Sequence, residues 1–186
     1  MATTLDEVWA LFREVAESQK DTDRRMKETD RQMKETDRQI KLLGKQIGEL
    51  GNRLGEFVEG LVKPAVVRLF QARGIDIHEV YPDVEVDRGT EGIQIDLLVV
   101  NDTEAVLVEV KSKLTVADVD DHVERLAKFK RLLPRYAEVR AMGAMAAMVI
   151  PKDAARYAYR QGFFVLAQTG DTVVILNDAK FQPKAW

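Results

Sequence analysis

The sequence predicts an α/β protein, in which a long N-terminal coiled-coil helix precedes a core of helices flanking a mixed β-sheet. Two observations carry this prediction. Apolar residues recur with a seven-residue period over residues 5–61, which is typical of a coiled coil. From about residue 56 the signals change to helix, three strands, helix, strand, helix and strand, an order that favours a sheet covered by helices. The chain therefore divides into an oligomerisation helix, residues 1–55, and a second domain, residues 56–186.

The heptad pattern predicts self-association. Its middle is nearly a repeat, TDRRMKE, TDRQMKE and TDRQIKL. A single solvated helix would gain only a few tenths of a kcal/mol from each i,i+4 ion pair, and its apolar stripe would stay exposed. We expect a homo-oligomer through residues 5–61, with two parallel strands favoured and a tetramer as the alternative. The two sets of core positions are Leu5, Phe12, Gln19, Met26, Met33, Ile40, Ile47, Leu54 and Leu61, and Val8, Val15, Thr22, Thr29, Thr36, Leu43, Leu50 and Phe57.

The remaining elements follow from local patterns. Thr4 and Glu7 have the spacing of a capping box at the start of the long helix. A second helix is expected over residues 56–74, with Pro64 inside it and a stop at Gly74. The tail of residues 178–186 is left unassigned. Strands are expected within residues 75–86, 93–100, 105–110, 144–150 and 163–177, the last with a turn at TGD, and helices over residues 116–134 and 151–162.

Composition excludes several classes of protein. The chain has no cysteine, so it has neither a disulfide framework nor a cysteine-based zinc site, which fits a cytoplasmic location. No apolar run approaches the roughly 18–20 residues of a membrane span, and the first residues have no signal-peptide pattern. The net charge of −3 argues against a surface that is basic throughout.

Two neighbouring strands carry charged residues on one face. Asp96 lies in QIDLLVV, and Glu109 and Lys111 lie in AVLVEVKS. The short NDTE turn between them predicts an antiparallel hairpin that brings Asp96 beside Glu109. Paired carboxylates repel unless a cation lies between them, and oxygen ligands select Mg²⁺ or Mn²⁺. Lys111 could then hold a water molecule or stabilise developing negative charge. An ordinary Glu/Lys pair at a strand end is the alternative.

These residues resemble the active site of the PD-(D/E)XK nuclease superfamily. The superfamily has a restriction-endonuclease-like αβββαβ core with an Asp on one strand and Glu-x-Lys on the next, as in QIDLLVV and VLVEVKS. Ile95 stands where many members have proline. Many members add a glutamate from the first helix, a place that Glu59, or as second choice Glu56, would take. The whole chain is similar to a bacterial family, common in cyanobacteria, that joins a coiled coil to such a core.

The resemblance implies a metal-dependent DNA endonuclease. Asp96 and Glu109 would bind Mg²⁺ or Mn²⁺, and Lys111 would assist the water or the phosphate. Glu59 would complete the metal site or hold Lys111 in place. Gln94 shares a face with Asp96 and is an accessory candidate. A non-catalytic oligomeric scaffold or DNA-binding module on the same fold is the alternative, as is a coiled coil that recruits a different protein.

DNA contacts are expected outside this cluster. Arg88, in the loop VDRGTEG, and Lys113, beside the site, are candidates because phosphate neutralisation requires cations. In KFKRLLPR, Lys128, Lys130 and Arg131 are more simply explained by the dipole at a helix C-terminus. His78 and His122 are expected on the surface.

Overall fold

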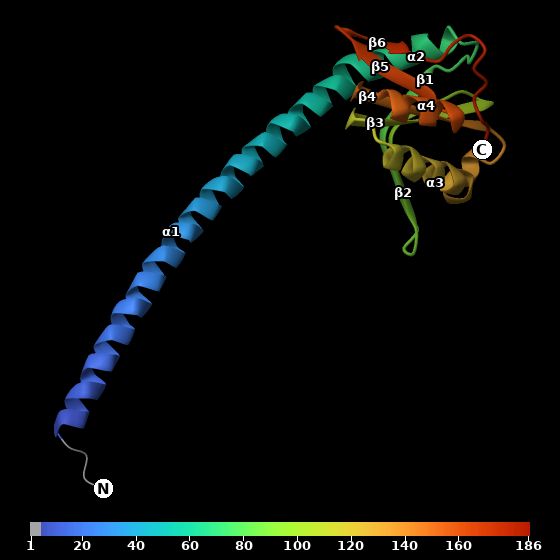
Figure 1. Ribbon diagram of the computed structural model, residues 1–186. Coiled ribbons are helices and arrows are strands. Elements are labelled where there is room, and N and C mark those ends of the chain that lie inside the picture. Colours follow the sequence, from blue (N-terminus) through green and yellow to red (C-terminus); the bar gives the residue numbers. More distant parts are fainter. Residues whose placement is uncertain (1–4) are drawn as a thin grey trace. The chain divides into compact units, whose positions relative to one another are not determined.

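The computed structural model describes residues 5–186, which form two compact units, residues 5–51 and Asn52–Trp186 (Figure 1). The first unit belongs wholly to one helix, α1 (Leu5–Phe57), as the heptad pattern predicts. The expected cap at Thr4 lies outside the described residues. None of the described helices has the length and apolar character needed to cross a membrane.

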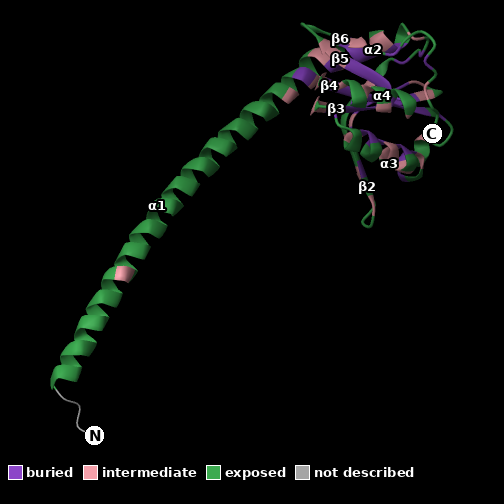
Figure 2. Cartoon of the chain, in the orientation of Figure 1, coloured by how far each residue is buried: buried purple, intermediate pink, exposed green. Residues whose placement is uncertain are grey.

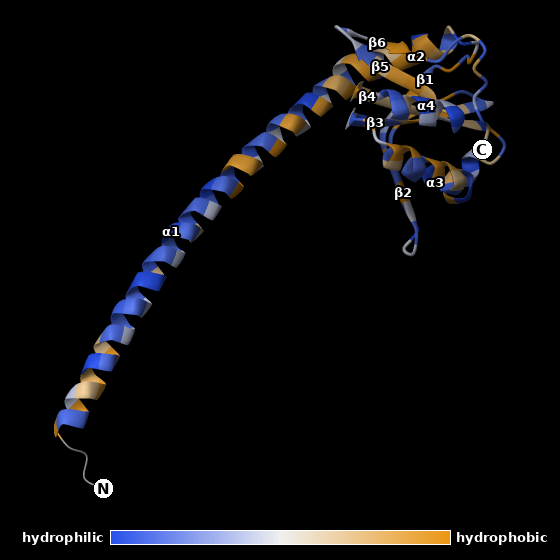
Figure 3. Ribbon diagram, in the orientation of Figure 1, coloured by the Kyte–Doolittle hydropathy of each residue, from blue (hydrophilic) through white to orange (hydrophobic). Residues whose placement is uncertain are grey.

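Residues 5–51 form a helix that is exposed almost throughout (Figure 2). Apolar side chains recur along it at the predicted spacing (Figure 3). Three threonines occupy positions in this stripe, and each hydroxyl donates a hydrogen bond to the carbonyl oxygen four residues earlier at 2.9 Å. The stripe therefore contains threonines whose polar atoms are already paired within the helix.

The heptad positions beyond Gly51 belong to the second unit. Phe57 is 2% exposed in the core of that unit, and Leu54 and Leu61 pack against the same core. Phe57 is therefore buried within its own unit and Leu54 and Leu61 are partly covered, so the stripe of exposed apolar side chains reaches Leu50 and not residue 61. A π-helical turn, η1 (Val58–Val62), and α2 (Lys63–Gln71) follow. Proline lacks an N–H, and Pro64 falls in the first turn of α2, directly after the π-helical turn.

The second unit is built on a six-stranded mixed sheet with the order β1-β2-β3-β4-β5-β6. β1, β2 and β3 are antiparallel neighbours, β3, β4 and β5 are parallel, and β6 returns antiparallel to β5. This arrangement confirms the predicted α/β class and the order of elements. The strands are β1 (Glu79–Asp87), β2 (Gly92–Val100), β3 (Glu104–Lys113), β4 (Arg140–Val149), β5 (Phe164–Thr169) and β6 (Thr172–Ile175).

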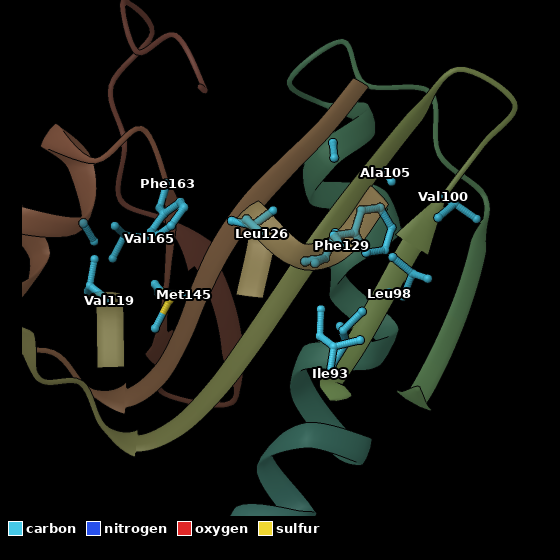
Figure 4. Close-up of a cluster of buried hydrophobic side chains, with 14 of the residues drawn as sticks. Ile93, Leu98, Val100, Ala105, Val119, Leu126, Phe129, Met145, Phe163 and Val165 are labelled. Carbon is cyan, nitrogen blue, oxygen red and sulfur yellow. The ribbon is translucent and has the colours of Figure 1, made fainter. Parts of the chain in front are cut away.

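Helices cover both faces of the sheet and enclose two hydrophobic cores. On one face α3 (Val116–Leu132) and α4 (Lys152–Arg160) pack over β2, β3, β4 and β5. Figure 4 shows buried side chains of this core, among them Leu126, Phe129 and Met145. The 3-10 turn η2 (Pro134–Tyr136) connects α3 to β4. On the other face η1, α2 and the end of α1 pack against the alternate residues of the same strands. Along β3 and β4 the side chains divide between the two cores by parity. In β2 the alternation is interrupted at Asp96, because Ile93 and Ile95 lie in the same core as Leu98 and Val100.

Local signals explain where these elements begin and end. Thr115 and Asp118 form a capping box at the start of α3, with Asp118 N donating to Thr115 Oγ1 at 3.2 Å. Gly74 has φ +80 after α2, as the expected stop requires. The unassigned tail returns to the sheet, where Trp186 N donates to the carbonyl oxygen of Ala141 at 2.9 Å.

Candidate active site

The structure brings Asp96 and Glu109 together where β2 separates from β3. β2 pairs with β1 along most of its length, whereas its register with β3 runs from Val100 back to Leu97, which faces Val108. One step further along the same register, Asp96 lies opposite Glu109. The carboxylate of Asp96 accepts a hydrogen bond from the backbone N–H of Val110 at 2.7 Å. The hairpin predicted from the sequence thus places two carboxylates beside each other.

Glu109 is a buried, ionised carboxylate with a cation at each oxygen. Its side chain is 3% exposed, Oε1 lies 2.6 Å from Lys111 Nζ, and Oε2 accepts a hydrogen bond from Arg125. Burial opposes ionisation of Glu109, but the hydrogen bonds from Arg125 and Lys111 outweigh it and lower its pKa. The charge of Glu109 is therefore compensated within the chain.

Asp96 has the opposite electrostatic balance. Burial and the negative charge of Glu109 raise the pKa of Asp96, and they outweigh the hydrogen bond from Val110 and the charges of Lys111 and Arg125. Ionisation of Asp96 is therefore less favourable in the folded protein than it is for an aspartate in water. A carboxylate whose pKa is raised by burial and a like charge is typical of functional sites, because a bound cation would reverse the penalty.

Lys111 stays protonated in this environment. Burial disfavours its ammonium group, but the hydrogen bond and the charge of Glu109 outweigh it and raise the pKa of Lys111. Its Nζ also lies 4.0 Å from Oδ1 of Asp118, whose other oxygen caps α3. Lys111 can therefore donate hydrogen bonds and stabilise negative charge, whereas a lysine that removes a proton requires a lowered pKa.

Two residues of α3 belong to this cluster although the sequence did not single them out for it. Arg125 reaches Glu109 from α3, and its side chain is 31% exposed. His122 is 1% exposed, so the expectation that it lies on the surface is wrong. Val119, His122, Leu126 and Phe129 share one face of the helix, and their spacing of three and four residues was the signal for burial. His122 Nε2 lies 3.0 Å from the carbonyl oxygen of Leu107.

The structure does not bring Glu59 or Glu56 to this pair of carboxylates. Glu59 lies in η1 and forms an ion pair with Lys63, with 3.0 Å between Oε2 and Nζ. η1 packs on the face of the sheet that holds Leu97 and Val108, whereas Glu109 contacts Arg125 of α3 on the other face. Glu56, at the end of α1, lines a cavity on the same face as η1 with Phe57, Gly60, Met148 and Gln168.

A groove adjoins the cluster between the β1–β2 hairpin and α3. Its volume is about 480 Å³, and it is lined by Gln94, by Arg125 and by further charged residues. Solvent in the groove therefore reaches Arg125, which also forms an ion pair with the buried Glu109. The charged residues that line it are Glu85, Asp87, Asp121, Glu124, Arg125 and Lys128.

The candidate DNA contacts have different surroundings. Arg88 at the tip of the hairpin donates a hydrogen bond to the carbonyl oxygen of Leu132 at 3.2 Å. Arg131 pairs with Glu91 in the same turn, so two contacts tie the hairpin tip to the end of α3. Lys113 is exposed at the end of β3. Of these candidates, Arg88 thus has a structural role and Lys113 is open to a ligand.

β1 is distorted opposite Asp96. The register passes from Pro82–Leu97 to Val84–Ile95, so Asp83 stands across from Asp96. Asp83 has φ +48, a conformation that is uncommon outside glycine. Strained backbone of this kind is frequent beside functional sites.

The donor atoms fit a hard cation better than zinc. Among residues 5–186, no three His, Asp or Glu side chains form a group that could hold a metal ion. The cluster offers two carboxylates, and Mg²⁺ commonly binds one or two carboxylates while it keeps several waters. The raised pKa of Asp96 is consistent with this fit, since a cation would stabilise its charged form. Arg125, which forms an ion pair with Glu109, would compete with a cation for this carboxylate.

Comparisons with known proteins give weak likenesses. The protein of unknown function AF1548 is 17% identical with a TM-score of 0.40, over 55% of this chain and 54% of that one. The small subunit of the heterodimeric restriction endonuclease R.BspD6I is 15% identical with a TM-score of 0.32, over 55% of this chain and 59% of that one. The match thus spans little more than half of each structure. No family model and no curated protein matches the chain.

Proposed function

We propose that residues 56–186 form a metal-dependent nuclease domain that hydrolyses phosphodiester bonds of DNA. The observation that carries this proposal is the pair of carboxylates on adjacent strands, in which Asp96 has a raised pKa and Lys111 Nζ lies 2.6 Å from Glu109. Asp96 and Glu109 would hold Mg²⁺ or Mn²⁺. When bound, such a cation would supply Lewis acidity that polarises a phosphate and acidifies a water molecule.

Lys111 would act on the phosphate or on the attacking water. Because it remains an ammonium group, it can donate a hydrogen bond to either and stabilise the negative charge that develops on the phosphate oxygens. Gln94 lines the adjoining groove and carries an amide that could orient the same water. Both roles require only hydrogen bonding, which suits groups that do not titrate near neutral pH.

Arg125 would link the binding of substrate to the binding of metal by Glu109. Its guanidinium occupies one oxygen of Glu109, while its side chain is 31% exposed and lines the groove. Guanidinium groups bind phosphates well, so a nucleic-acid phosphate that reached Arg125, against the repulsion of the four carboxylates of the groove, could draw Arg125 away. An oxygen of Glu109 would then be free to bind the cation.

A non-catalytic module is the second candidate. The observation in its favour is the ion-pair network itself, because Lys111 and Arg125 already satisfy both oxygens of Glu109. In that case the cluster would only stabilise the fold, and the chain would serve as a scaffold or bind DNA without cutting it.

Self-association would make either function multivalent. The exposed apolar stripe of residues 5–51 supports pairing with other copies of the chain. An oligomeric nuclease would carry several sites and could cut both strands of a duplex.

The two candidates differ in a cleavage assay. The full-length protein is incubated with supercoiled plasmid and Mg²⁺ or Mn²⁺, and nicking is expected to stop when the metal is chelated. Lys111→Ala is expected to slow cleavage by about 100-fold or more, while thermal stabilisation by Mn²⁺ persists because Asp96 and Glu109 remain. Lys180→Ala, at an exposed position, is the matched control and should cleave like the parent protein. If the parent protein shows neither cleavage nor metal-induced stabilisation, the scaffold is favoured.

A further inference from the structure

The helix of residues 5–51 presents an apolar face that is free to accept a partner. Its side chains are largely exposed, with Met33 at 60%, Ile40 at 60% and Ile47 at 69%. These residues lie at every seventh position and are called the a positions, and the second set of the stripe, four residues before the next a position, is called d. A stripe of this width and period fits a second helix rather than a globular surface.

The d positions in the middle of the stripe suit burial although they are threonines. The hydroxyls of Thr22, Thr29 and Thr36 donate to the carbonyl oxygens of Ser18, Arg25 and Gln32, each at 2.9 Å. A second helix would therefore meet their methyl groups without leaving a hydrogen-bond donor unpaired. Gln19 is the one polar residue among the a positions that keeps a donor and an acceptor to offer.

The charges beside the stripe distinguish the two possible directions of the partner. On one flank, directly after each d position, lie Asp23, Asp30 and Asp37. On the other flank, directly before each a position, lie Arg25, Gln32 and Gln39. In a parallel pair, the residue before an a position on one helix faces the residue after the following d position on the other helix. In an antiparallel pair like flanks meet.

A second copy of the chain fits this pattern in the parallel direction. Arg25 of one helix would face Asp30 of the other, and Gln32 would face Asp37. In an antiparallel pair of full overlap Asp23 of each helix would lie beside Asp30 of the other, which is a repulsive arrangement. The exposed pair of Arg25 with Asp21, 3.0 Å apart, does not hold Arg25 back, because such exposed pairs contribute little.

The register of the two helices follows from Gln19, the polar residue among the a positions. A shift by one heptad would preserve the repeated middle, but it would place Gln19 opposite the apolar Met26. A polar residue at one a position is a device that fixes register, since it pairs well only with itself. We therefore propose that residues 5–51 form a two-stranded, parallel, in-register coiled coil with a second copy of this chain. This inference rests on the self-association in the proposed function and is independent of catalysis.

Single cysteines provide the test, because the chain has none of its own. Val15→Cys at a d position and Ile40→Cys at an a position are made in the full chain and oxidised mildly. In the parallel dimer each variant cross-links with itself, several-fold more than Arg31→Cys on the outer face. In an antiparallel dimer of full overlap position 15 faces position 40, so only a mixture of the two variants would cross-link. That result would overturn the proposal.

Sedimentation of the parent chain separates the remaining outcomes. A dimer at micromolar concentration is expected. A monomer would refute both the proposal and the self-association it rests on, and a tetramer would refute the two-stranded form, while the cleavage assay addresses the nuclease separately.

A charge exchange supplies a readout that does not depend on cysteine. Asp30→Lys is expected to weaken dimerisation several-fold at low salt, and the double variant Arg25→Glu/Asp30→Lys should restore it. A double variant that dimerises no better than Asp30→Lys would contradict the facing of these two positions.

Discussion

The carboxylate of Asp96 accepts a hydrogen bond from the backbone N–H of Val110, the residue between Glu109 and Lys111, at 2.7 Å. This contact lies where β2 and β3 cease to pair, so the side chain of Asp96 takes the place of a sheet hydrogen bond. It holds Asp96 beside Glu109 although their charges repel. The charge of Asp96 is destabilised by burial and by Glu109, and a bound cation would remove this electrostatic penalty.

Asp96→Asn is expected to stabilise the metal-free protein by about 0.5–1 kcal/mol, as removal of functional strain commonly does. Asparagine can still accept the hydrogen bond from Val110, and it removes the charge that burial and Glu109 disfavour. The same variant should lose stabilisation by Mn²⁺, which for the parent protein would be roughly 1.4 kcal/mol at a concentration ten times Kd. Thermal unfolding with and without Mn²⁺ measures both effects.

Asp171→Asn, in the exposed turn between β5 and β6, is the control for this pair of effects. It should leave both the stability and the response to Mn²⁺ unchanged. An Asp96→Asn protein that responds to Mn²⁺ like the parent would remove Asp96 from the proposed metal site.

Arg125→Met is expected to lower the stability of the metal-free protein and to enlarge its response to Mn²⁺. Glu109 would retain Lys111 as its sole cationic partner, and loss of a partly exposed pair of this kind should cost about 1–2 kcal/mol. The vacated oxygen of Glu109 would become available to the metal. Calorimetric titration with Mn²⁺ measures the affinity, and a weaker affinity than the parent's would contradict competition between Arg125 and the metal.

Acid should destabilise the fold through His122. Burial lowers the pKa of His122 from 6.5 to about 4 in the folded protein. Between these values the unfolded chain binds a proton that the folded protein does not, so stability is lost as the pH falls through this window. The total loss from this group is roughly 3 kcal/mol, since one pKa unit corresponds to about 1.4 kcal/mol.

Urea unfolding at pH 7 and pH 4.5 tests this prediction. His122→Phe keeps an aromatic ring beside Phe163 and should show a smaller fall in stability between the two conditions. His78→Gln, at an exposed position, should behave like the parent. Equal pH dependence in the parent and in His122→Phe would show that other groups govern acid unfolding.

Gly143→Ala should destabilise the second unit by about 1–3 kcal/mol, the usual effect of overpacking a core. A methyl group on this residue of β4 would lie 2.6 Å from side-chain atoms of Leu126 and Phe163. Chemical denaturation measures the loss. Gly60→Ala meets no atom within 4 Å and should not destabilise, and a Gly143→Ala protein as stable as the parent would argue against this packing of α3 on the sheet.

The sequence by itself determined the β2–β3 hairpin and, with it, the neighbourhood of Asp96 and Glu109. Alternation assigns the residues of β3, and those of β2 after Asp96, to a face, and the short turn from Asn101 to Glu104 sets the register. Both are local properties of the chain, and the structure has the predicted order of elements. The long helix is also determined by local sequence, because each heptad by itself shows the spacing of apolar residues that predicts a helix.

Only the tertiary structure decided which segments cover the faces that these local patterns create. Arg125 joins Glu109 because α3 packs across β2 and β4 in one orientation, which depends on how Leu126 and Phe129 fit side chains from distant strands. The heptads beyond residue 51 show the same limit, since Phe57 keeps the period of the coiled coil but is buried in the second unit. A periodic pattern predicts that one face of a helix is buried, but it does not predict which other element of the protein covers that face. That choice depends on the packing of residues far apart in the sequence, and the same packing put η1, which carries Glu59, on the opposite face of the sheet from Glu109.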